Sequence, residues 1–191
     1  RNFEIELADA DPDWWAFMDI APVTGRKATL KVNKLPEDSA GLKSIDQSDG
    51  IKNSESLYRE KLRPQFHFSS RRGWNNDPNG LVFYKGEYHL FYQHNPYGWN
   101  WGNMHWGHAV SEDLVHWRDL PYAIYPGIEK MCFSGGTVVE KKQVVAFYPG
   151  IEAGQMVAIA RDPLLLNWEK IEGNPVTRSG EPMGDSCIWK E

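Results

Sequence analysis

The chain has 191 residues and a formal net charge of −5, from 21 basic and 26 acidic residues. This length suits one domain, or one domain with an appendage. No basic stripe is present, which excludes the electrostatic signature of a nucleic-acid-binding protein. No apolar run approaches the roughly 18 residues of a membrane-spanning helix. No secretory signal is recognisable, although processing of a longer precursor would remove one.

Two N-terminal segments are predicted ahead of the main domain. Apolar residues alternate with polar ones in short runs over residues 1–33, which indicates a small β appendage. Residues 34–61 are polar and contain clusters of Pro, Asp, Ser and Gly, which are typical of a linker. We therefore expect the main domain to span residues 62–191.

The main domain is predicted to consist of β-hairpins that repeat along the chain. Pairs of apolar runs flank short polar turns, residues 81–84 with 88–93 and residues 137–139 with 144–148. Gly80 recurs as Gly136 and Asp113 as Asp162, at offsets of 56 and 49 residues, and a third copy begins at Asp185. An all-β repeat near 50 residues predicts propeller blades of four antiparallel strands, about two blades and the start of a third.

The first strand of each predicted blade carries the polar residues. In a propeller this strand lines the central axis, so Asp77, Ser134 and Asp185 are expected to converge on one pocket. Paired carboxylates are what glycoside cleavage requires. The alternative is that Asp77 only forms a turn, because Asn-Asp-Pro-Asn-Gly is also typical turn chemistry.

Several motifs in order resemble those of glycoside hydrolase family 32, the invertases, levanases, inulinases and related fructosidases. Residues 74–80 (WNNDPNG) resemble the family signature, and the similarity continues over residues 91–96 (FYQHNP), 101–109 (WGNMHWGHA) and 133–135 (FSG). It extends from about Leu62 to the end of the chain. The resemblance implies a five-bladed β-propeller, preceded here by the small β appendage.

The resemblance also implies a retaining mechanism. Asp77 would be the nucleophile that attacks the anomeric carbon of a fructosyl unit, and Asp185 would stabilise the transition state. The acid/base glutamate is expected beyond residue 191, and the two reacting carboxylates should lie roughly 5 Å apart. The residues that resemble the fructose-binding set are Trp74, Asn76, Gln93, Trp101, Phe133 and Ser134.

The second carboxylate departs from the family pattern. The family motif is Arg-Asp-Pro, which occurs literally around Asp162, but Asp162 is the repeat partner of Asp113 and is therefore predicted to lie in an outer turn. Asp185 has the expected blade position, although Gly184 and Ser186 replace the usual neighbours. We therefore favour Asp185.

Substrate and partners follow from the resemblance. Sucrose or a β-fructan such as levan or inulin is the expected substrate, and the later blades of the same protein, with an optional C-terminal β-sandwich, are the expected partners. A secreted or periplasmic location suits fructans. The resemblance implies no metal or organic cofactor. His105 and His108 are an alternative pair of metal ligands, but residues at this spacing lie on opposite faces of a strand, which favours structural roles. Cys132 and Cys187 are expected to be free core thiols, with a disulfide as the alternative.

Two other function classes are compatible with a propeller. The first is a non-catalytic sugar-binding propeller, which would have no need of a nucleophile at Asp77. The second is a protein-interaction propeller, which would need none of the polar residues on the axial strands. Neither class accounts for Asp77, Ser134 and Asp185 together, so the sequence favours an enzyme.

Overall fold

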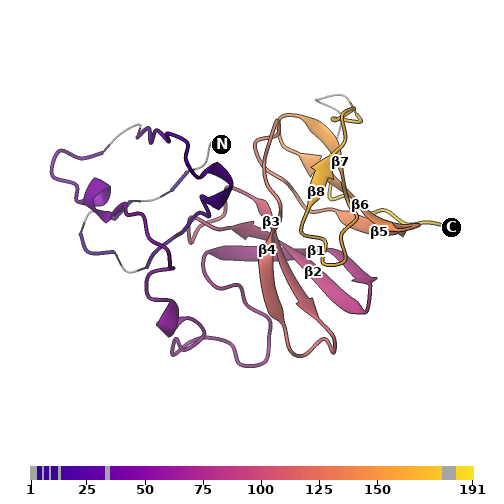
Figure 1. Cartoon of the computed structure of the whole chain (residues 1–191), viewed down its shortest axis with the longest axis horizontal. Helices are drawn as coiled ribbons and strands as arrows, with labels where there is room; N and C mark the ends of the chain where they lie inside the picture. The colour runs from indigo at the N-terminus through magenta and orange to yellow at the C-terminus, as the bar shows by residue number, and fades with distance from the viewer. Residues whose placement is uncertain (1–3, 6, 9, 13, 33–34, 178–183) are drawn as a thin grey trace.

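The computed structural model describes residues 4–5, 7–8, 10–12, 14–32, 35–177 and 184–191. Within them the chain forms two four-stranded antiparallel sheets whose strands lie in chain order (Figure 1). The first sheet consists of β1 (Trp74–Tyr84), β2 (Glu87–Asn95), β3 (His105–Ser111) and β4 (Arg118–Ile124). The second consists of β5 (Gly136–Glu140), β6 (Gln143–Gly150), β7 (Gly154–Ala160) and β8 (Trp168–Lys170). The predicted all-β architecture is confirmed.

Turns close the first hairpin of each sheet where the sequence predicts them, but each turn has two residues instead of the predicted three, because Glu87 and Glu140 belong to the strands. The β1–β2 turn has φ angles of 53° at Lys85 and 95° at Gly86. Positive φ at both central residues matches the twist of the flanking strands. The β5–β6 turn begins with Lys141, which also has a positive φ of 57°.

An acidic turn joins the third and fourth strands in both sheets. Asp113 accepts hydrogen bonds from two backbone amides of the β3–β4 turn, at 2.8 and 2.7 Å. Asp162 accepts two from the β7–β8 turn, both at 2.9 Å. The repeat is therefore confirmed, and Asp162 lies in an outer turn as expected.

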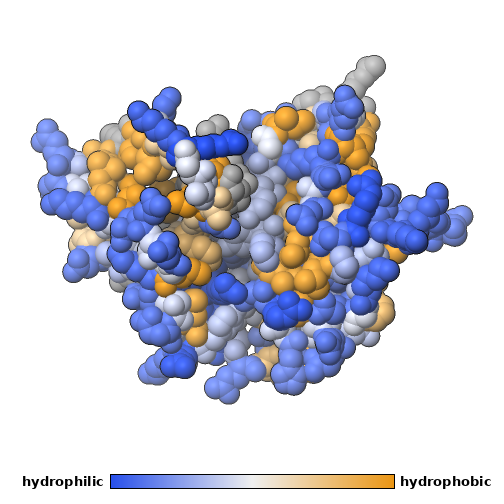
Figure 2. Space-filling model, viewed as in Figure 1, coloured by the Kyte–Doolittle hydropathy of each residue, from blue (hydrophilic) through white to orange (hydrophobic). Residues whose placement is uncertain are grey.

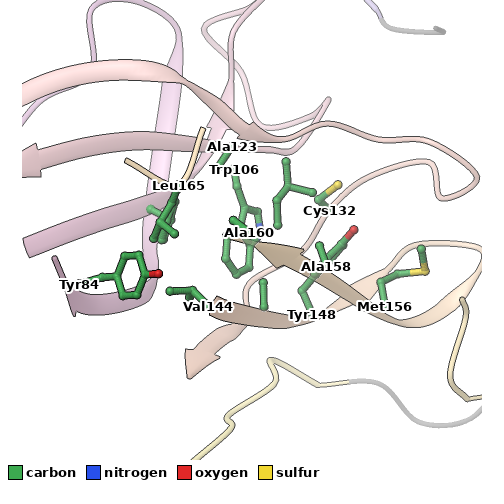
Figure 3. Close-up of a cluster of buried hydrophobic side chains, with 13 residues drawn as sticks. Tyr84, Trp106, Ala123, Cys132, Val144, Tyr148, Met156, Ala158, Ala160 and Leu165 are labelled. Atoms are coloured by element: carbon green, nitrogen blue, oxygen red, sulfur yellow. The ribbon is translucent and has the colours of Figure 1, made fainter. Parts of the chain in front are cut away.

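Apolar side chains between the two sheets form the core (Figure 3). Trp106 of β3 and Tyr148 of β6 are fully buried, with ring centroids 5.6 Å apart. The first strands of the sheets meet at Gly80, whose backbone N–H donates to the Gly135 carbonyl at 3.0 Å. A Cβ on Gly80 would lie 2.7 Å from the side chain of Thr137, so this close approach requires glycine. The two sheets thus pack against each other through their first strands, as neighbouring propeller blades would, and we refer to them below as the first and second blade.

The strands predicted for residues 1–33 are wrong for the described part of that segment, which contains one short 3-10 helix, η1 (Ala21–Val23), and no strand. Alternation alone does not make a strand, because each strand needs a partner. Apolar residues such as Ile5, Leu30 and Val32 remain more than 40% exposed. Figure 2 shows such apolar groups on the surface of the N-terminal segment.

Residues 35–73 contain two further 3-10 helices, η2 (Gly41–Ser44) and η3 (Ser54–Ser56). Arg72 joins this segment to the first one, because its guanidinium donates to the Trp15 carbonyl at 2.7 Å and to the Lys52 carbonyl at 3.2 Å. The division at residues 33/34 and 61/62 stays a prediction. In the part of the chain that the structure describes, no helix has the length and apolar character needed to cross a membrane.

The start of the third copy lies beside the second blade. The Ser186 N–H donates to the Ser134 carbonyl at 3.2 Å, and Ile188 lies against Gly136 of β5. Residues 184–191 have no strand assignment. Both cysteines are free, but only Cys132 is buried, so the prediction of a core position is wrong for Cys187. Cys187 is exposed because it lies in residues 184–191, which belong to no strand.

Candidate active site

Asp77 lies within β1 and not in a turn. Asn75 pairs with His94 and Pro78 pairs with Tyr92, so Asn76 and Asp77 together oppose the single residue between those partners. Such a β-bulge breaks the alternation of side chains and redirects one of them. The side chain of Asp77 is consequently exposed, although the strand continues to Tyr84. The interpretation of Asp77 as a turn former is wrong.

Ser134 holds one oxygen of the Asp77 carboxylate. The Ser134 hydroxyl donates to Asp77 Oδ2 at 2.8 Å, and Ser134 is only 9% exposed. A hydrogen bond to a charged acceptor is stronger than one between neutral groups. The first blade therefore supplies an accessible carboxylate, and the second blade orients it.

The backbone that carries Ser134 is itself anchored on both sides. The Gln93 side-chain amide donates to the Cys132 carbonyl, and the Trp106 indole N–H donates to the Phe133 carbonyl, both at 3.0 Å. The Phe133 N–H donates to a backbone carbonyl of β6 at 2.9 Å. Gln93 is 2% exposed, and its amide nitrogen donates to the backbone. The role of Gln93 in a sugar subsite stays a prediction.

Exposed aromatic side chains lie near Asp77 and Ser134. The Trp101 ring meets the Phe133 ring edge to face, with centroids 5.8 Å apart, and Trp101 is 54% exposed. The Trp74 indole N–H donates to Asn76 Oδ1 at 2.9 Å, which orients both side chains at the start of β1. Flat aromatic faces with adjacent amide groups are able to hold a sugar ring.

Asn95 supports the loop beside the candidate site, a role that was not predicted from the sequence. It is 4% exposed, and its amide donates to the Asn100 carbonyl at 2.8 Å while its oxygen accepts from the Tyr97 N–H at 3.0 Å. These bonds shape the loop that presents Trp101. The sequence signals for Asn95 were its place in the 91–96 motif (FYQHNP) and its position directly before a proline.

Asp185 is exposed, and the backbone of the residue that follows it contacts the Ser134 segment. The adjacent residue, Ser186, bonds to the Ser134 carbonyl and, through its hydroxyl, to Gln155 at 2.8 Å. Asp77 therefore contacts Ser134, and the Ser134 segment contacts the segment of Asp185. The convergence of the two carboxylates on one pocket stays a prediction. Asp162, in contrast, is committed to the backbone of its turn.

Buried histidines support the site without reaching it. His94 Nδ1 lies 2.9 Å from the Trp74 carbonyl, so that nitrogen carries the proton and donates. Burial lowers the pKa of His94 to about 4, so the ring is neutral at pH 7. The ring nitrogens of His89 and His108 lie 2.9 Å apart in the core, and burial lowers the pKa of His108 to about 3.

His105 and His108 of β3 serve different surroundings, as their spacing predicts. The His105 ring packs against Tyr97 and Tyr125, whereas the His108 ring stacks with His89. Among the described residues, no group of three or more His, Cys, Asp and Glu side chains is arranged to hold a metal ion.

Comparisons with known proteins agree with these observations. The sequence model of the glycosyl hydrolases family 32 N-terminal domain matches residues 67–187. The chain is 49% identical over 135 residues to the levanase of Bacillus subtilis, covering 63% of this chain and 20% of the levanase. The chain thus spans about a fifth of the length of this curated relative.

Solved structures lead to the same family. The β-fructofuranosidase of Bombyx mori superimposes with a TM-score of 0.61 and 44% identity, covering 68% of this chain and 30% of that one. A mutant of that enzyme in complex with sucrose gives a TM-score of 0.60 and 42% identity, with the same coverage. Since the family match covers more than half of the chain, this protein belongs to glycosyl hydrolase family 32, and residues 67–187 match the N-terminal domain of that family.

Proposed function

We propose that the protein is a retaining β-fructosidase that releases fructose from sucrose or from β-fructans, with Asp77 as its nucleophile. The observation that carries the proposal is the exposed Asp77 carboxylate, which a bulge redirects and the Ser134 hydroxyl orients at 2.8 Å. The names of the relatives, a levanase and an enzyme crystallised with sucrose, support this substrate class.

The site residues take separate roles in this proposal. Ser134 holds Asp77 Oδ2, so that Oδ1 attacks the anomeric carbon of the fructosyl unit. The bond to the leaving oxygen breaks as a general acid protonates that oxygen, and water then hydrolyses the glycosyl-enzyme ester. The acid is a glutamate outside residues 1–191, and Asp185 binds sugar hydroxyls and stabilises the positive charge that develops on the ring.

The aromatic residues bind the sugar and exclude water from the reacting bond. Trp101 and Phe133 form one wall, and the Trp74–Asn76 pair forms the other. The Gln93 amide acts indirectly by fixing the Cys132 carbonyl next to Ser134. We extend the proposal to later blades of the same protein as partners and to a secreted or periplasmic location.

The test is fructose release from sucrose, inulin and levan by the protein in its full natural length. Asp77→Asn should lower kcat by at least about 10³-fold, because it removes the nucleophile but keeps the shape and an acceptor for Ser134. Asp113→Asn is the matched control, because Asp113 occupies an outer turn. Sugar binding without fructose release by the wild type would instead indicate a non-catalytic sugar-binding propeller.

A further inference from the structure

A fully buried carboxylate lies behind the segment that carries Ser134. Glu129, in the connection between β4 and β5, has a side chain with 0% exposure. Its Oε1 accepts from the Tyr148 hydroxyl at 2.9 Å, from the Cys132 thiol at 3.3 Å and from the Lys170 ammonium. Its Oε2 accepts from the Gly127 N–H at 3.2 Å. Both oxygens are therefore occupied inside the fold.

The Glu129–Lys170 ion pair connects the outermost strand of the second blade to this connection. Lys170 belongs to β8 and also donates to the Tyr125 carbonyl at 2.7 Å. Burial tends to raise the pKa of Glu129, but the Lys170 hydrogen bond and charge outweigh it, so that pKa is lowered and the group is ionised. A buried pair of this kind gives little net stability, because desolvation opposes the attraction. The more specific effect of the pair is to fix the position of the β4–β5 connection relative to β8.

The contacts of Glu129 lead to Asp77 in few steps. Cys132, which donates its thiol to Glu129, is two residues before Ser134, and its carbonyl is the acceptor for Gln93. A Cβ on Gly135 would lie 2.2 Å from a backbone carbonyl of β6, so the backbone there has no room to shift inward. The position of Ser134 against Asp77 therefore depends in part on the position of Cys132.

We infer that Glu129 is a positioning residue for the reaction, which holds residues 132–134 so that the Ser134 hydroxyl stays on the Asp77 carboxylate. The inference rests on the proposed function for its kinetic consequence and on geometry alone for its structural one. Glu129 touches neither substrate nor reacting atoms. Its effect passes through Cys132 to Ser134, and from Ser134 to Asp77.

The kinetic test is a double-mutant cycle in the full-length protein. Glu129→Gln should lower kcat for fructose release by about tenfold or more, with KM changed by less than about threefold, because misplacement affects the transition state most. In a Ser134→Ala background the same substitution should cost less than about twofold, because the link to Asp77 is already lost. Losses that multiply in the double variant would overturn the inference, since a merely structural role acts equally in both backgrounds.

Glu152→Gln is the matched control. Glu152 pairs with Lys130 in the same region at 3.2 Å, but both side chains are more than half exposed, so its kcat should equal that of the wild type. Tyr148→Phe is the second variant, which removes one hydrogen bond from Glu129 without changing charge. Tyr148→Phe replaces Glu129→Gln in the test if the latter does not fold. Its loss of kcat should likewise be smaller in the Ser134→Ala background than in the wild type.

Hydrogen exchange provides a readout independent of activity. In Glu129→Gln or Tyr148→Phe, the amides of residues 131–136 should exchange faster, whereas those of β2 and β3 should not change. Unchanged exchange over residues 131–136 would overturn the inference. If the wild type releases no fructose, the proposed function fails, and the exchange comparison alone then decides whether Glu129 positions this segment.

Discussion

The stability of the fold should fall as the pH is lowered from 7 to 4.5, and His94 should be one identifiable cause. His94 is 2% exposed and lies between the rings of Tyr92 and Tyr122. Burial lowers its pKa from 6.5 to about 4 in the folded protein. Between pH 6.5 and about pH 4, His94 is protonated in the unfolded chain but neutral in the folded one. The free energy of unfolding therefore decreases as the pH falls.

The magnitude follows from the two pKa values. The contribution of His94 is fully present above pH 6.5 and is lost progressively down to about pH 4. One pKa unit corresponds to about 1.4 kcal/mol, so His94 should account for ~2.5 kcal/mol of lost stability at pH 4.5. Burial lowers the pKa of His108 to about 3, which adds a loss of the same sign.

The substitution His94→Asn isolates this contribution. The asparagine Nδ2 can donate to the Trp74 carbonyl as His94 Nδ1 does, but the side chain does not titrate. Urea unfolding at pH steps from 7.5 to 4.5 should show a loss of stability smaller by ~2.5 kcal/mol in the variant. His67→Asn, at an exposed position, is the control. An identical pH dependence for wild type and His94→Asn would refute the argument.

Two further substitutions test the packing and the repeat. Gly107→Ala should destabilise the protein by ~1–3 kcal/mol in thermal unfolding, because the new Cβ would lie 2.3 Å from the Tyr92 ring; an unchanged Tm would contradict the described packing. Asp162→Ala should remove two backbone hydrogen bonds and ~1 kcal/mol of stability, while the KM and kcat of the folded fraction remain at wild-type values. A selective loss of kcat in Asp162→Ala would indicate that Asp162, and not Asp185, is the second carboxylate of the active site.

The blades could be predicted from the sequence because their signals are local. The turn between the two apolar runs of the first hairpin contains Gly86, which readily adopts the positive φ found there. The pair Asp113 and Asp162 marks the same turn in each copy. Strand order then follows, because short hairpin connections leave little choice of partner. The repeat and the motifs together predicted that a strand carries Asp77, and β1 does. The same prediction is wrong for Ser134, which lies two residues before β5 in a segment without strand assignment.

The remaining features depend on contacts between distant parts of the chain. Apolar alternation near Leu30 does not reveal whether a partner strand exists, and Leu30 is 64% exposed. The bulge at Asp77 is visible only in the pairing of β1 with β2. Glu129 looks like a solvated loop residue in the sequence, whereas three donors from β6, β8 and Cys132 make its burial possible.

The most direct test of the account is to identify the residue that becomes fructosylated. The full-length protein would be mixed with substrate, quenched with acid during turnover, digested, and its peptides weighed by mass spectrometry. We expect one fructosyl unit on the peptide that contains Asp77, lost in Asp77→Asn, and release of fructose with retained configuration. An adduct on Asp185, or inverted fructose without any adduct, would contradict the assignment of Asp77 as the nucleophile.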